Sequence, residues 1–116
     1  MTRSETIYIV EDDVSLSRSL VRSLRKRGYN VVAFEAADAF LAEFTAGQLA
    51  CLILDYGLPG MNGLELQEHL KAQRVQIPIV FISGHGGVPE SVRATKAGAI
   101  DFLEKPYKPE VLIDRI

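Results

Sequence analysis

Short runs of mostly apolar residues alternate along the chain with stretches of helical periodicity, and this alternation restricts the folds open to it. The runs are Ile7–Val10, Asn30–Phe34, Cys51–Leu54, Ile79–Ile82 and Ile100–Glu104. Parallel strands need long crossover connections, which helices usually provide. The third and fourth runs are apolar at every position, as expected for strands buried on both faces. We therefore predict an α/β fold, doubly wound, with a five-stranded parallel sheet and helices on both faces.

The segments between the runs carry apolar residues at helical spacing. The clearest stripe extends from Leu16 to Leu24, and Gly28 marks its end, because glycine suits the left-handed position just past a helix. Further helices are predicted before Gly47, after Gly63, over residues 88–99 and from Pro109 onwards. The chain stops about two turns into this last helix, so we expect either a short helix or a cut chain.

Length and composition exclude several classes of protein. The 116 residues suffice for one domain with its own core, and the net charge of -2 predicts no direct binding of nucleic acid by this domain. Cys51, the single cysteine, cannot form an internal disulfide and is typical of a buried residue in a reducing compartment. The sequence has no membrane-spanning stretch and no signal-peptide pattern, so we expect a cytoplasmic protein without a membrane partner.

Polar side chains directly follow four of the runs. They are Glu11, Asp12 and Asp13 after the first run, Asp55 after the third, Ser83 after the fourth and Lys105 after the last. In parallel sheets the carboxyl ends of the strands meet at one edge, which is where such folds bind ligands. Each residue also has an ordinary interpretation: Asp13 as a helix cap, Asp55 as a turn residue and Lys105 as a solvated lysine.

Taken together, the carboxylates at this edge indicate a bound cation. Carboxylates brought together repel one another unless a cation lies among them, and hard oxygen ligands suit Mg²⁺. Because Mg²⁺ usually keeps phosphate oxygens among its ligands, the site favours phosphoryl chemistry. Ser83 and Lys105 would then contact phosphoryl oxygens, and Asp55, central among these groups, is placed as the nucleophile.

The order Glu11-Asp12, Asp55, Ser83 and Lys105-Pro106, each at a strand end, closely resembles the receiver domains of bacterial two-component response regulators. The segments 83–89 and 97–106 are similar to the FixJ-like branch. The resemblance covers almost the whole chain and implies one receiver domain over residues 1–116, with the flavodoxin-like strand order 2-1-3-4-5. It also implies a C-terminal effector domain outside this chain, of the helix-turn-helix, DNA-binding type.

The resemblance assigns a role to each matching position. Asp55 accepts a phosphoryl group from a sensor histidine kinase, while Asp12, Asp55 and the backbone carbonyl of Gly57 hold Mg²⁺, with Glu11 acting through water. Lys105 contacts the phosphoryl group from the far side. The domain is then a regulatory phosphoacceptor that loses its phosphoryl group slowly, rather than an enzyme.

The resemblance also implies how the signal leaves the site. Ser83 and Phe102 act as switch residues that respond to phosphorylation, and the last helix-strand-helix face supports a phosphorylation-favoured homodimer or controls the effector domain. Serine at 83 and phenylalanine at 102 depart from the commoner threonine and tyrosine, and both occur in the family.

Three alternatives stay open at this stage. A phosphorylation-independent pseudo-receiver would use the same fold only for protein contacts. A phosphatase of the haloacid-dehalogenase type needs a second aspartate where this chain has Gly57. A flavodoxin-like or dinucleotide-binding domain needs phosphate-binding glycines where this chain has Glu11, Asp12 and Asp13.

Overall fold

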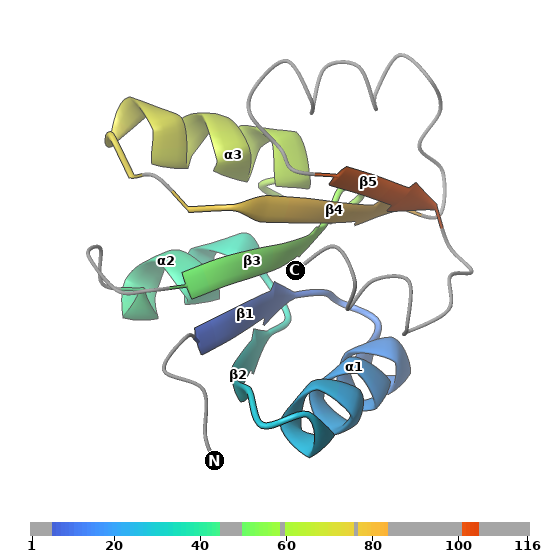
Figure 1. Ribbon diagram of the computed structural model, residues 1–116. Helices are drawn as coiled ribbons and strands as arrows, with labels where there is room; N and C mark the ends of the chain where they lie inside the picture. Colours follow the sequence, from blue (N-terminus) through green and yellow to red (C-terminus); the bar gives the residue numbers. More distant parts are fainter. Residues whose placement is uncertain (1–5, 45–49, 59, 76, 84–100, 105–116) are drawn as a thin grey trace.

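The computed structural model describes residues 6–44, 50–58, 60–75, 77–83 and 101–104. Five parallel strands form one sheet in the order β2-β1-β3-β4-β5 (Figure 1). Their bounds are Thr6–Val10 for β1, Asn30–Phe34 for β2, Ala50–Asp55 for β3, Ile79–Ser83 for β4 and Asp101–Glu104 for β5. The predicted parallel sheet and its strand order are confirmed.

Three helices lie in the described ranges: α1 spans Val14–Lys26, α2 spans Ala37–Glu43 and α3 spans Gly63–Ala72. α1 contains the predicted stripe and ends before Gly28, α2 ends before Gly47, and α3 begins at Gly63, as the sequence predicts. The two helices predicted over residues 88–99 and from Pro109 lie outside the described residues. Among the described helices, none is long and apolar enough to cross a membrane.

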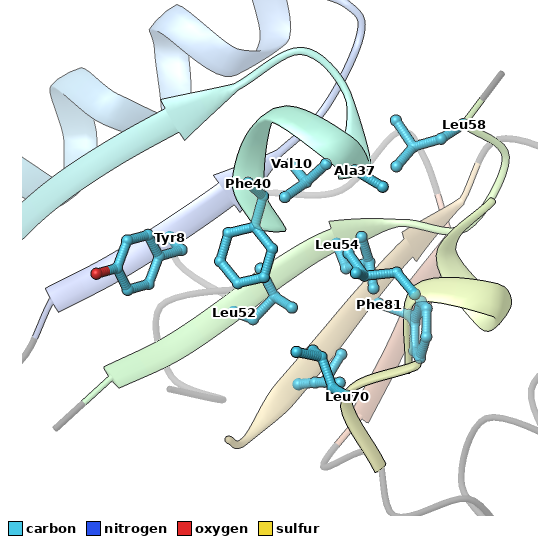
Figure 2. Packing of buried hydrophobic residues seen from close by; sticks show 11 residues of the cluster. Tyr8, Val10, Ala37, Phe40, Leu52, Leu54, Leu58, Leu70 and Phe81 are labelled. Carbon is cyan, nitrogen blue, oxygen red and sulfur yellow. The ribbon is translucent and has the colours of Figure 1, made fainter. Parts of the chain in front are cut away.

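Alternate side chains of the strands enter two separate hydrophobic clusters, one on each face of the sheet. On one face, Ile7, Ile9 and Ile53 pack with Leu20 and Leu24 of α1. The opposite cluster contains Tyr8, Leu52, Leu54 and Phe81 from the strands, Phe40 from α2, and Leu66 and Leu70 from α3 (Figure 2). The strands contribute to both clusters because successive strand residues point to opposite faces of the sheet. The helix residues in each cluster show that α1 covers one face, and that α2 and α3 cover the other.

The end of α1 shows how local sequence sets the limits of an element. Gly28 adopts a φ of 93°, a left-handed conformation that glycine reaches without a steric penalty. Its N–H donates to the carbonyl of Arg25 at 3.0 Å, and the N–H of Tyr29 donates to the carbonyl of Leu24 at 3.2 Å. This pair of bonds is a Schellman motif, and it turns the chain from α1 into β2.

Candidate functional site

The acidic triplet after β1 divides into residues with different environments. Glu11 is fully buried, and its backbone N–H donates to the carbonyl of Phe34 at 3.0 Å, which continues the pairing of β1 with β2. Asp12 is exposed. Asp13 is the N-cap of α1, since its Oδ1 accepts a hydrogen bond from the N–H of Leu16 at 3.1 Å. The predicted cap at Asp13 is confirmed.

Asp13 also touches the buried carboxylate of the triplet. Its backbone N–H donates to Oε2 of Glu11 at 3.2 Å. The turn into α1 therefore helps to hold the Glu11 side chain at the carboxyl edge of the sheet, and Asp13 contributes to the site through its backbone rather than its charge.

Asp55 is the last residue of β3, the central strand of the sheet. It lies opposite Ile82 of β4, and only 5% of its surface is exposed. The backbone N–H of Gly57 donates to Oδ1 of Asp55 at 3.0 Å, which holds the carboxylate in one orientation. The next residue, Tyr56, keeps the chain attached to β4 through an N–H bond to the carbonyl of Ile82 at 2.8 Å.

The segment after Asp55 is tied to the start of α3. The N–H of Gly63 donates to the carbonyl of Tyr56 at 3.1 Å. Asn62 and Glu65 then form a capping box, in which each side chain accepts a hydrogen bond from the backbone N–H of the other. The backbone N–H groups of Asn62 and Glu65 are both satisfied in this way. These two hydrogen bonds fix the first turn of α3 next to the loop that follows Asp55.

Ser83 is the last residue of β4 and directly follows Ile82, which pairs with Asp55. Only 2% of the surface of Ser83 is exposed. The sheet therefore brings its hydroxyl-bearing residue to the edge where Glu11, Asp12 and Asp55 lie, as the sequence predicts. In β5, the backbone of Phe102 pairs with Phe81. Lys105 directly follows β5 and lies outside the described residues, so its position at this edge stays a prediction.

The three carboxylates converge closely enough to share one ion. Glu11, Asp12 and Asp55 each offer a carboxylate oxygen, and these oxygens lie within 4.8 Å of one another. Two of the three residues are buried, where charges of like sign repel strongly unless a cation compensates them. Hard oxygen donors with one solvent-facing member fit Mg²⁺, which retains water or phosphate ligands.

One contact of the site carries no signal in the sequence. The ring of Tyr56 packs edge-to-face against Phe81, with ring centroids 5.6 Å apart and an interplanar angle of 64°. Tyr56 is half-buried, and it packs against the cluster that α2 and α3 cover. A tyrosine beside the carboxylate thus anchors the loop to the core, and only the three-dimensional proximity of β3 and β4 reveals it.

The sequence matches a family model for the response regulator receiver domain over residues 7–116. The chain belongs to the response regulator receiver domain family. Nodulation protein W of Bradyrhizobium diazoefficiens is 44% identical over 110 residues, which cover 95% of this receiver domain and 48% of that protein. The transcriptional regulatory protein FixJ of the same organism is 40% identical over 112 residues, which cover 97% of this receiver domain and 55% of that protein.

The structural comparison agrees with the sequence comparison. The solved structure of the response regulator StyR superposes with a TM-score of 0.92 at 46% identity, covering 98% of this receiver domain and 58% of that chain. The similarity to FixJ supports the FixJ-like branch. The receiver domain spans about half the length of the curated relatives it matches. Members of the family serve as phosphorylation switches in two-component systems, a regulatory rather than an enzymatic role.

Proposed function

We propose that Asp55 is the phosphoacceptor of this receiver domain and that a sensor histidine kinase is the donor. The observation that carries the proposal is the position of Asp55 at the end of the central strand, with the carboxylate oxygens of Glu11 and Asp12 within 4.8 Å. The burial of Ser83 at the end of the neighbouring strand adds a hydroxyl to the same edge. No other described carboxylate combines these neighbours.

The reaction is a phosphoryl transfer between two side chains. A carboxylate oxygen of Asp55 attacks the phosphorus of a phosphohistidine in line, the P–O bond forms, the P–N bond breaks, and the imidazole leaves. The Gly57 N–H bond to Oδ1 orients the carboxylate before the attack. Water later cleaves the acyl phosphate and restores Asp55.

Glu11, Asp12, Asp55 and the backbone carbonyl of Gly57 would hold Mg²⁺, with Glu11 acting through water. When bound, the ion neutralises charge on the phosphoryl oxygens in the transition state. Lys105 would neutralise the same oxygens from the opposite side as a point charge. The carboxylate cluster supports the ion, and the assignment of Lys105 rests on its position in the sequence directly after β5.

The output follows from a shift between two pre-existing conformations. The hydroxyl of Ser83 turns towards the phosphoryl group, and Phe102 rotates into the space that this movement opens. The last helix-strand-helix face then favours a homodimer or releases an attached effector domain. A helix-turn-helix, DNA-binding effector and a cytoplasmic location are proposed by analogy with regulators such as FixJ, whose name describes it as transcriptional.

Acetyl phosphate with Mg²⁺, followed by mass spectrometry, tests the assignment. The wild-type domain should gain the mass of one phosphoryl group, and Asp55→Asn should gain none, because its amide is not a nucleophile. Asp13→Asn is the matched control: it removes a neighbouring charge but keeps a good N-cap, so labelling should continue. Full labelling of Asp55→Asn would reject this site.

A second measurement distinguishes the proposed phosphoacceptor from the alternative of a phosphorylation-independent pseudo-receiver. Beryllofluoride mimics the phosphoryl group, so it should bind the wild-type domain in the presence of Mg²⁺ and shift its spectrum, and it should fail to bind Asp55→Asn. A wild-type domain that neither gains the phosphoryl mass nor binds beryllofluoride would favour the pseudo-receiver.

A further inference from the structure

A concave surface that is open to solvent lies between α1 and the edge strand β2, and none of its lining residues belongs to the carboxylate cluster. This α1–β2 groove has a volume of about 690 Å³. Its small or apolar lining residues are Ser17, Val21 and Ala33, and its basic lining residues are Arg18, Arg22, Arg25 and Lys26. All four basic residues are exposed. The groove therefore combines an apolar patch with four positive charges.

Helix electrostatics accounts for only part of this charge. Arg25 and Lys26 lie in the last turn of α1, where cations interact favourably with the helix dipole. Arg18 and Arg22 lie in the middle of the helix, where the dipole gives no such benefit. They are also four residues apart on one face, a spacing at which like charges repel and weaken an isolated helix. The helix dipole therefore does not account for the two central arginines.

One of the cations is already held in position. Nη2 of Arg25 donates to the carbonyl of Val31 in β2 at 3.2 Å. Val31 belongs to the outermost strand of the described sheet, so this bond fixes the guanidinium across the boundary between helix and strand. A group held before binding loses less conformational entropy when a ligand arrives. Within the described ranges, none of the four basic residues is paired with a carboxylate.

We propose that the α1–β2 groove binds an acidic peptide segment that carries an apolar side chain. Its carboxylates would pair with Arg18 and Arg22, since the planar guanidinium can bind a carboxylate through two parallel hydrogen bonds. Its apolar side chain would cover Val21 and Ala33. This surface is distinct from the Asp55 edge, so the proposal does not depend on phosphorylation.

The charge distribution favours a peptide over a nucleic acid as the occupant. Asp12 is exposed just before α1, and Asp13 is exposed as its cap. A long polyanion that followed α1 would meet these two carboxylates, whereas a short acidic segment confined to the groove would not. The net charge of -2 also gives no general attraction to nucleic acid.

Fluorescence anisotropy with a labelled peptide, Glu-Glu-Leu-Glu-Glu, tests the proposal on the unphosphorylated wild-type domain. Saturable binding should weaken at least tenfold in Arg18→Glu/Arg22→Glu. The matched control, Arg27→Glu/Lys71→Glu, makes the same change in net charge at exposed positions that do not line the groove, and it should weaken binding less than threefold. Circular dichroism establishes that each variant is folded. Replacing the leucine of the peptide with serine should also weaken binding.

Three results would overturn the proposal. The first is the absence of saturable binding by the wild-type domain. The second is equal weakening by both double variants, which would indicate unspecific attraction to the whole surface. The third is tighter binding of a short DNA duplex than of the peptide, lost with Arg18 and Arg22, because it would assign the groove to nucleic acid.

Discussion

Gly63 lies so close to the end of β3 that a Cβ added to it would be 2.7 Å from the backbone carbonyl oxygen of Asp55. The same atom would be 2.9 Å from Cα of Tyr56 and 2.9 Å from Cε1 of Phe81. Two of these three neighbours are backbone atoms, which cannot rotate away. Gly63, the first residue of α3, thus packs directly against the backbone of Asp55, the proposed phosphoacceptor.

We predict that Gly63→Ala lowers the free energy of unfolding by about 1–3 kcal/mol, the usual cost of overpacking a buried site. Urea denaturation should show a lower midpoint with an unchanged slope. Gly57→Ala is the control, because its added Cβ would have Oδ1 of Asp55 at 3.9 Å as its nearest neighbour, an ordinary contact. Equal stability of the Gly63 variant and wild type would show that α3 can move away from Asp55.

Arg74, two residues after the end of α3, adopts a left-handed conformation with a φ of 58°. It occupies the position that Gly28 has after α1, because the N–H of Arg74 donates to the carbonyl of Lys71 at 3.0 Å and the N–H of Val75 donates to that of Leu70 at 2.9 Å. We predict that Arg74→Gly raises the free energy of unfolding by about 1 kcal/mol, since glycine avoids the steric cost of this conformation.

Thermal unfolding measures this gain as a rise in Tm of about 3–6 °C for a domain of this size. Gln73→Gly is the matched control. Gln73 has a φ of -83°, so glycine relieves no strain there and should lower Tm instead. A fall in Tm for both variants would mean that the Arg74 side chain stabilises the fold by more than its left-handed backbone conformation destabilises it.

Asp12 and Asp13 are adjacent and both acidic, yet the structure predicts different effects on stability and on Mg²⁺ binding when each is replaced by alanine. Asp13→Ala should cost about 1 kcal/mol of stability, because the N–H of Leu16 loses its cap. Asp12→Ala should leave stability unchanged or raise it, because it removes one of three converging carboxylates. It should also weaken Mg²⁺ binding at least tenfold in calorimetry. Similar Mg²⁺ affinities for both variants would contradict this division.

The strands and the carboxylate cluster follow from the sequence, because apolar runs identify buried strands and a parallel sheet brings their carboxyl ends to one edge. The strand order is predicted only from the resemblance to receiver domains. Other features depend on contacts between distant residues or on backbone angles. The left-handed turn after α1 is predictable because glycine occupies position 28, whereas the equivalent turn after α3 has arginine at position 74 and is not predictable from the sequence. The Tyr56–Phe81 contact likewise needs the pairing of β3 with β4. The role of Lys105 stays a prediction from the sequence.

Cys51 should react differently in the folded and the unfolded chain, and alkylation can measure the difference. It is 7% exposed in β3, and burial raises the pKa of its thiol from 9.0 to about 11, although a backbone hydrogen bond from Leu52 lowers it in part. The thiol therefore stays protonated and inaccessible at neutral pH, and the thiolate is the form that reacts. Iodoacetamide at pH 8 should modify the folded domain far more slowly than the domain in urea.

The same shift fixes the sign of the effect on stability. The unfolded thiol ionises near 9.0 and the folded thiol near 11, so the stabilisation is complete below pH 9 and is lost as the pH rises towards 11. In Cys51→Ala this alkaline loss should be smaller, although the variant is less stable at neutral pH because the buried sulfur is removed. Urea denaturation at pH 7 and pH 10 measures both effects. Equal alkaline losses in the two proteins would show that another group controls stability in this range.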